Sequence, residues 1–328
     1  MGESRSRLSR SWTGRRGWPW PLRWKAHACG SRTPAAALVL VACLAVLWPI
    51  APSPAAARPL FEPWIDGTSP TEPEVQIQQY DRDTYVIRQS LRTNAEGPFV
   101  YLLFGSERAL LLDTGAGGLK IRPSIDAAIA QWLAAHHRTS IPLVVAHSHG
   151  HGDHHQGDGE FSDRPDTVVV GLTPQEVAAF FKIANWPNDI VTFDLGKRTL
   201  DIIPTPGHQV AHIMVFDERT RLLLSGDSLY PGRLYVPSNM FADFRASIDR
   251  VVGFTKQRHV AHILGAHIEM TAVAGKDFVV GAQQHPHERV LPLPYSDLLA
   301  LQASVTAMGE TVARDVRDDF IVFPLPPR

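Results

Sequence analysis

Cysteine is nearly absent from this sequence of 328 residues, because its two cysteines, Cys29 and Cys43, both lie within the first 57 residues. From residue 58 onward the chain can form neither a disulfide bond nor a thiolate ligand to a metal. Any metal site in that part must therefore be built from histidine and carboxylate side chains.

Clustered positive charge is also missing after residue 57. Residues 58–328 contain 24 Lys and Arg against 32 Asp and Glu, a net charge of about -8. Binding to nucleic acid requires grouped Lys and Arg side chains that contact phosphates. The composition argues against nucleic acid as the natural ligand, and we expect a small-molecule substrate.

Residues 1–57 have the pattern of a targeting segment. Eight basic residues and one acid precede or flank an apolar run from Ala35 to Ala51, and Ala55, Ala56 and Ala57 follow. This order is typical of a secretory signal peptide, which predicts cleavage after Ala57 and an exported protein, periplasmic or secreted. An uncleaved anchor is the alternative, since about 17 apolar residues is the short limit for crossing a bilayer. We expect membrane contact only through this segment, if it stays uncleaved or is lipidated.

The rest of the chain has the pattern of one folded domain. Residues 58–80 are rich in proline and are expected to form an irregular leader. After them, short apolar runs typical of strands alternate with stretches that have helical spacing. The predicted strands are 84–89, 99–104, 109–113, 141–146, 167–170, 190–193, 200–204, 213–216, 222–224 and 260–264; the predicted helices are 121–136, one capped by Thr173, one capped by Ser238 or Asn239 and ending near Phe254, and 295–309. This interleaving predicts a single α/β domain over residues 81–328.

The strongest chemical signal is a six-residue motif, His149-Gly150-His151-Gly152-Asp153-His154, directly after the predicted strand 141–146. Histidines two residues apart in an extended chain point to the same side. The glycines allow the backbone to fold so that Asp153 and His154 also face inward. Three imidazoles and a carboxylate so close together predict that the motif binds a metal.

Four more residues of the ligand type follow apolar strands. These are Asp113, His208, Asp227 and His267. Active sites of α/β folds lie where strands end, so we expect these side chains to converge with the motif.

In this order the motif and its partners resemble the metallo-β-lactamase superfamily, over residues 85–270. The resemblance implies an αββα four-layer sandwich. It also implies that His149, His151 and His208 bind a first metal, that Asp153, His154 and His267 bind a second, and that Asp227 bridges the two. Asp113 would hold the motif loop through hydrogen bonds. His147 falls outside this register and is not expected to be a ligand.

Nitrogen and carboxylate ligands without sulfur suit zinc, although iron and manganese are also compatible. A pair of divalent metals can share a water molecule and lower its pKa toward ~7, which makes the bridging hydroxide the expected nucleophile. Asp153 is the expected catalytic residue, steering the nucleophile and passing a proton to the leaving group. We therefore predict an exported dinuclear metal-dependent hydrolase of a small ester, lactone, amide or related bond.

Asp227 indicates which branches of the superfamily the chain resembles. The best-known β-lactam-cleaving members carry cysteine or another residue there, whereas Asp resembles the thioesterase, lactonase and phosphodiesterase branches. Tyr230 and Tyr235 follow closely and either line the substrate pocket or pack against the sheet. His212, four residues after His208, is a further candidate for contact with substrate or with the ligand shell.

Two alternatives to hydrolysis remain at this point. One is a mononuclear iron dioxygenase acting on a persulfide, because that branch keeps similar ligands. The other is a non-catalytic metal- or ligand-binding module on the same fold. The complete ligand set favours an enzyme over the latter, because a site that has lost its chemistry should also have lost ligands.

Overall fold

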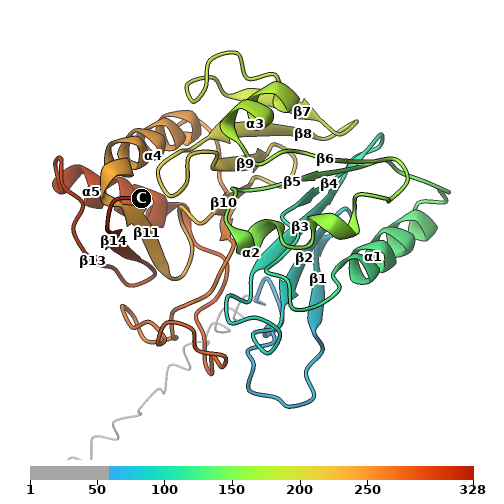
Figure 1. Ribbon diagram of the computed structural model, residues 1–328, viewed down its shortest axis with the longest axis horizontal. Coiled ribbons are helices and arrows are strands. Elements are labelled where there is room, and N and C mark those ends of the chain that lie inside the picture. Colours follow the sequence, from blue (N-terminus) through green and yellow to red (C-terminus); the bar gives the residue numbers. More distant parts are fainter. Residues whose placement is uncertain (1–58) are drawn as a thin grey trace, which may run out of the picture. The chain divides into compact units, whose positions relative to one another are not determined.

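Apolar strands form the centre of the molecule. We describe the molecule from a computed structural model of residues 59–328 (Figure 1). All six residues of strand β3 (Phe99–Phe104) are buried. Successive side chains point to opposite faces of a sheet, so Tyr101 packs into the core between two sheets and Leu102 into a core on the outer face. A strand buried on both faces explains why this run is continuously apolar.

The first sheet has six strands in the order β1-β2-β3-β4-β5-β6. Its first four strands are antiparallel, and β5 and β6 add to it in parallel. Besides β3, its strands are β1 (Val75–Asp81), β2 (Thr84–Gln89), β4 (Ala109–Leu112), β5 (Leu143–Ala146) and β6 (Thr167–Val169).

The second sheet has five strands in the order β12-β10-β9-β8-β7, and a smaller sheet has the order β11-β14-β13. The strands of the second sheet are β7 (Val191–Asp194), β8 (Thr199–Pro204), β9 (Ile213–Asp217), β10 (Leu222–Gly226) and β12 (His262–Gly265). Those of the third are β11 (Arg233–Pro237), β13 (Asp315–Val316) and β14 (Ile321–Leu325).

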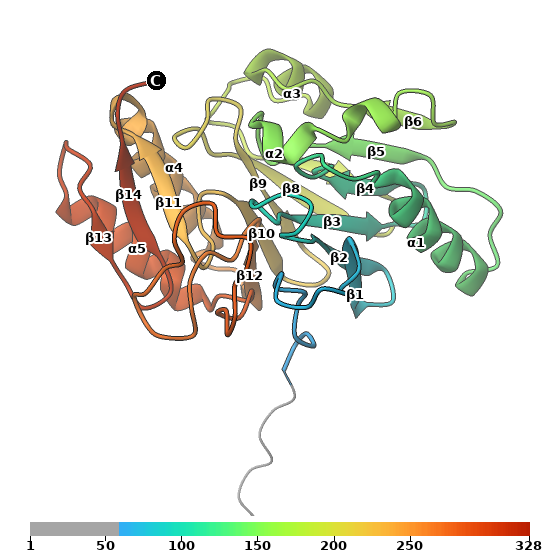
Figure 2. The same cartoon turned by 60° about the horizontal axis from the view of Figure 1, so that its bottom comes forward.

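Helices cover the outer faces of both large sheets. Ile125 and Trp132 of α1 (Arg122–Ala135) pack on the first sheet. Phe244 of α4 (Phe241–Thr255) and Leu301 of α5 (Tyr295–Ala307) share a core with the outer side of the second. Figures 1 and 2 show α1 and α4 on opposite sides of the two sheets. The predicted αββα four-layer sandwich is thus confirmed.

Four short helical segments complete the fold: α2 (Gly152–His155), α3 (Pro174–Phe181) and two 3-10 turns, Asp158–Glu160 and Ser238–Met240. The predicted cap of α3 is present, since Thr173 accepts from the Glu176 backbone and the Glu176 carboxylate accepts in return. The predicted cap of α4 is wrong. The helix starts at Phe241 after a 3-10 turn, and the Asn239 side chain instead pairs with the backbone of Arg328.

The segment 58–80 is less irregular than the sequence suggested. Strand β1 begins at Val75 and pairs with β2 along its length, with an irregularity near Asp81. The predicted signal segment, residues 1–57, lies outside the described residues. Between residues 59 and 328, no helix combines the length and the apolar character that crossing a membrane requires.

Candidate metal centre

Loops at one end of the two sheets bring the predicted ligands together. The motif follows β5 and runs into α2, whose four residues include Asp153 and His154. His208 follows β8, Asp227 follows β10, and His267 follows β12. The side chains fall into two groups, in each of which the possible ligand atoms lie within 4.8 Å of one another.

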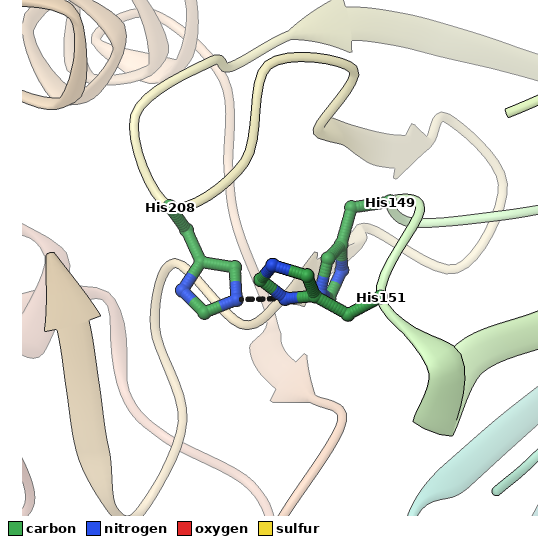
Figure 3. Close-up of side chains that lie close together, drawn as sticks. All are labelled: His149, His151 and His208. Carbon is green, nitrogen blue, oxygen red and sulfur yellow. Dashed lines mark hydrogen bonds between the residues drawn. The ribbon is translucent and has the colours of Figure 1, made fainter. Parts of the chain in front are cut away.

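The first group is His149, His151 and His208 (Figure 3). His151 Nδ1 lies 2.9 Å from His149 Nε2 and 2.9 Å from His208 Nε2. The three rings point toward one another from two separate loops. Nitrogen lone pairs that converge this closely repel unless a proton or a cation lies between them.

The second group is Asp153, His154, Asp227 and His267. Asp153 Oδ2 lies 3.2 Å from His154 Nε2 and 3.4 Å from His267 Nε2. The two imidazole nitrogens are themselves 3.5 Å apart. Two carboxylates and two histidines in a buried position form a donor set suited to a divalent cation.

Asp227 lies between the two groups and turns one oxygen toward each. Its Oδ2 is 3.5 Å from His208 Nε2 and 3.8 Å from His149 Nε2. Its Oδ1 is 3.4 Å from His267 Nε2 and 3.6 Å from His154 Nε2. Oδ1 is buried and has no hydrogen-bond partner. Burying a carboxylate oxygen without a partner costs free energy. A metal ion bound to Oδ1 would remove this cost.

Hydrogen bonds behind the histidines fix their orientation. Four of the five rings direct Nε2 into the site and present Nδ1 to an oxygen outside it. His208 Nδ1 donates to the Tyr235 carbonyl at 2.8 Å, and His267 Nδ1 donates to the Glu96 carbonyl at 2.9 Å. Such outer contacts set the tautomer of a metal-binding histidine. His151 is reversed: its Nδ1 faces the site, and its Nε2 lies 2.7 Å from Arg328 Nη1.

Asp113 holds the motif loop, as the resemblance implied. Its Oδ1 accepts from the Ser148 backbone N–H at 2.7 Å, and its Oδ2 accepts from Ser148 Oγ at 2.9 Å and lies 3.0 Å from His154 Nδ1. Asp113 itself has a positive φ of 72°. His147 does not join either group, because its Nε2 pairs with Asp158 Oδ1 at 2.8 Å.

The histidine pKa values shift in opposite directions in the two groups. Burial lowers the pKa of His149 and His208, and burial next to His208 lowers the pKa of His151 to about 4. The first group is therefore neutral near pH 7, which is the protonation state that a metal requires of imidazole.

In the second group, the carboxylates raise the histidine pKa values more than burial lowers them. Burial by itself lowers the pKa of His154 and His267, but Asp227 and Asp153 hold both values well above the usual range. Their charges in turn hold the pKa of Asp227 well below its usual range against the effect of burial. This group therefore attracts positive charge, and a divalent cation would replace the two protons.

The residues present thus fit two divalent metals. The first group offers three neutral nitrogens, the second offers two nitrogens and a carboxylate, and Asp227 offers an oxygen to both.

A cavity of about 390 Å³ opens onto both groups. His151, Asp153, Asp227 and His267 lie at its base, and Tyr230 and Tyr235 are in its wall. The Tyr230 hydroxyl donates to the Arg233 carbonyl and lies 3.0 Å from Glu269, so it is already engaged. The Tyr235 hydroxyl accepts from Arg233 Nε at 2.7 Å, which leaves its own proton available.

His212 does not line this cavity and contacts candidate ligands instead. The ring is buried behind Asp227: its Nε2 accepts from the Asp227 backbone N–H at 3.2 Å, and its Nδ1 lies 2.7 Å from Thr205 Oγ1. It also stacks on His149, with the ring centroids 5.2 Å apart. His212 therefore positions two of the candidate ligands.

Several residues of the cavity were missed by the sequence analysis. They are Ala95, Glu96, Arg233, Glu269, residues 279–282, Leu325 and Arg328. Arg233 is buried and paired, with Nη2 2.7 Å from Glu269 Oε1 and Nη1 3.0 Å from Asp277 Oδ2. None of these residues belongs to a motif; each reaches the site through long-range packing.

The match to a protein family agrees with this geometry. The family model of the metallo-beta-lactamase superfamily matches residues 93–259, which include all the candidate ligands except His267. The chain belongs to this superfamily. It is an enzyme, a metallo-hydrolase.

Among other superfamily members, the chain is similar to two kinds of hydrolase. The acyl-coenzyme A thioesterase MBLAC2 of Bos taurus is 25% identical over 201 residues, covering 51% of this chain and 72% of that protein. The hydroxyacylglutathione hydrolase of Ectopseudomonas mendocina is 29% identical over 112 residues, covering 34% of this chain and 42% of that protein. Among solved structures, a metallo-beta-lactamase from Pontibacter korlensis matches with a TM-score of 0.44 and 18% identity, covering 59% of this chain and 91% of that one.

Proposed function

We propose that this superfamily member is a dinuclear metal-dependent hydrolase that cleaves a small ester, thioester, lactone, amide or related acyl bond. The observation that carries the proposal is the position of Asp227, with one carboxylate oxygen toward each ligand group. A carboxylate placed in this way can be shared by two metals. The names of the relatives, which include an acyl-coenzyme A thioesterase and a hydroxyacylglutathione hydrolase, favour acyl substrates.

Each side chain has a defined part in this proposal. His149, His151 and His208 would hold one metal, and Asp153, His154 and His267 the other, with Asp227 shared. When bound, two such metals supply Lewis acidity and lower the pKa of water. Zinc suits the donor set best, and iron and manganese are the other metals to test.

Asp153 and Tyr235 would act on the substrate side. The charges of His154 and His267 keep the pKa of Asp153 low despite burial, so its carboxylate is ionised and can orient an attacking water. Burial raises the pKa of Tyr235, so its phenol keeps the proton and can donate to the oxygen on which negative charge develops.

Export is also part of the proposal. It is supported by the order of basic, apolar and small residues in 1–57. We propose a periplasmic or secreted enzyme that works on small molecules, touching the membrane only if this segment is retained or lipidated.

Metal analysis joined to activity tests the central proposal. The purified protein is expected to contain about two zinc ions per chain and to hydrolyse members of a panel of esters, thioesters, lactones and amides. In Asp227→Asn the metal content should fall to about one or less, and kcat/KM should fall about 100-fold or more. Asp201→Asn, a buried carboxyl outside the site, is the control and should retain both.

Two results would contradict the proposal. One is a single iron per chain with oxygen uptake on a persulfide and no hydrolysis, which would favour the dioxygenase. The other is normal metal content and full activity in Asp227→Asn.

A further inference from the structure

Two exposed valines stand at the mouth of the cavity. The exposed fraction of Val279 is 82% and that of Val280 is 69%, and both side chains line the same cavity as His151, Asp153 and His267. They lie in the long irregular segment between β12 and α5, drawn in orange in Figures 1 and 2. Single exposed apolar residues are common on protein surfaces, so the exposure alone means little. The exposure of these two valines is informative because both line the cavity of the candidate metal centre.

The loop that carries these valines is anchored on both sides. The Phe278 backbone N–H donates to the Glu269 carbonyl at 2.8 Å, and the Phe278 carbonyl accepts from Arg233 Nη1 at 2.7 Å. The Phe278 ring stacks on His285, with centroids 4.2 Å apart and planes inclined by 2°. The Ala282 N–H closes a turn on the Val279 carbonyl at 3.0 Å. The two valines are therefore presented by a fixed turn.

The cavity consequently has two chemical parts. One part is lined by the side chains of the candidate metal centre, and another by the apolar residues Val279, Val280, Ala282 and Leu325, which we call the apolar rim. The remaining lining includes the polar side chains of Glu96, Arg233, Glu269, His285 and Arg328. A volume of about 390 Å³ is enough for a small organic molecule. A substrate whose scissile bond lies at the base would place the adjoining group against the apolar rim.

We propose that Val279 and Val280 bind an aliphatic chain next to the scissile bond, and that this loop sets the chain-length preference of the enzyme. The proposal rests on the hydrolase function proposed above. In the reaction, the oxygen of water bonds to the acyl carbon, the acyl–oxygen or acyl–sulfur bond breaks, and the leaving group takes up a proton. The chain belongs either to the acyl group or to the leaving group, and two substrate series separate these cases.

The first series is p-nitrophenyl esters from acetate to octanoate; the second is alkyl acetates from ethyl to octyl. We compare the wild-type protein with Val279→Ser/Val280→Ser. The matched control is Val273→Ser/Val290→Ser, because these valines are similarly exposed, at 62% and 68%, but lie outside the cavity. Thermal unfolding of all three proteins shows that they are folded.

In the wild type, kcat/KM should rise about twofold per methylene in one of the two series, about half the fourfold gain expected for full burial. In the loop variant this rise should become at most half as steep, so that its loss of kcat/KM grows with chain length. The control should keep the wild-type dependence. Calorimetry with octanoate gives a readout without turnover: binding should weaken about threefold or more in the loop variant alone.

The outcomes separate this proposal from the one on which it rests. If the wild type hydrolyses no ester, thioester, lactone or amide, the proposed function fails. If it hydrolyses short esters but shows no chain-length dependence, or if the loop variant keeps the wild-type dependence, the proposed function stands and the role of Val279 and Val280 is refuted.

Discussion

Tyr235 is the side chain in the cavity wall with a hydroxyl proton still available. Its oxygen is held by Arg233 Nε, and its backbone carbonyl holds the ring of His208. The residue thus joins the wall of the pocket to the first ligand group. The hydroxyl of Tyr230, although only five residues earlier, is committed to Arg233 and Glu269, and its ring packs edge-on against His267.

Replacing Tyr235 by phenylalanine should therefore lower kcat about 10-fold to 100-fold while KM changes little, because the lost bond is strongest when charge develops on the substrate oxygen. The backbone contact to His208 remains, so the metal content should be unchanged. Steady-state kinetics and metal analysis check this. Tyr230→Phe is the matched control, with a smaller effect on kcat. An unchanged kcat in Tyr235→Phe would exclude the role in donating to substrate.

At the scale of elements, strand β8 contains an unusual carboxyl. Asp201 is buried, and its Oδ2 has no hydrogen-bond partner. Burial, with the neighbouring Glu218, raises its pKa to about 6. The folded protein therefore holds this proton more tightly than the unfolded chain, in which the pKa is near 3.8. Its contribution to stability is present below about pH 3.8 and is lost as the pH rises to about 6.

Asp201→Asn removes this pH dependence. Relative to the wild type, the variant should gain stability between about pH 4 and 6 and keep the gain above that range. The expected size is about 1 kcal/mol. Denaturant unfolding at pH 4, 6 and 8 measures it. A stability difference that is constant over this range would show that the carboxyl has no raised pKa.

Some elements are stabilised by residues close in sequence and others by distant partners, and only the first kind could be predicted. Thr173 and Glu176 cap α3 through contacts three residues apart, so this start could be predicted. Strands β11 and β14 pair in parallel although Arg233 and Ile321 are far apart in the sequence. Neither strand was predicted, because their stability comes from partners that a local pattern does not include. The same holds for Asn239, which caps no helix and binds the backbone of Arg328 instead.

On the scale of the whole molecule, the ligands come from loops after β5, β8, β10 and β12, so both large sheets are needed to build the site. The family motif made these ligands predictable. The rest of the cavity was not, because Glu96, Arg233 and the turn of Val279 and Val280 carry no motif. Glu96 lies between β2 and β3, Arg233 begins β11, and the two valines belong to the irregular segment after β12, so these residues meet only in the folded protein.

Processing of the full chain is a separate prediction. Expression in a bacterial host with an export system should yield a mature protein that begins at Arg58, because cleavage is expected after Ala57. Intact mass measurement of the soluble extracytoplasmic fraction checks this. A full-length chain found only with the membrane would instead support the uncleaved anchor.

The contact between Arg328 and His151 links metal loading to the position of a distant segment. An imidazole that gives its Nδ1 lone pair to a cation carries its proton on Nε2. That proton would face the guanidinium nitrogen 2.7 Å away, so two donors would meet and Arg328 would have to leave. The side chain thus competes with the first metal, and thermodynamic linkage makes the competition reciprocal. Arg328→Ala should bind the first zinc about twofold to fivefold more tightly in chelator competition, and equal affinities would show that the two are uncoupled.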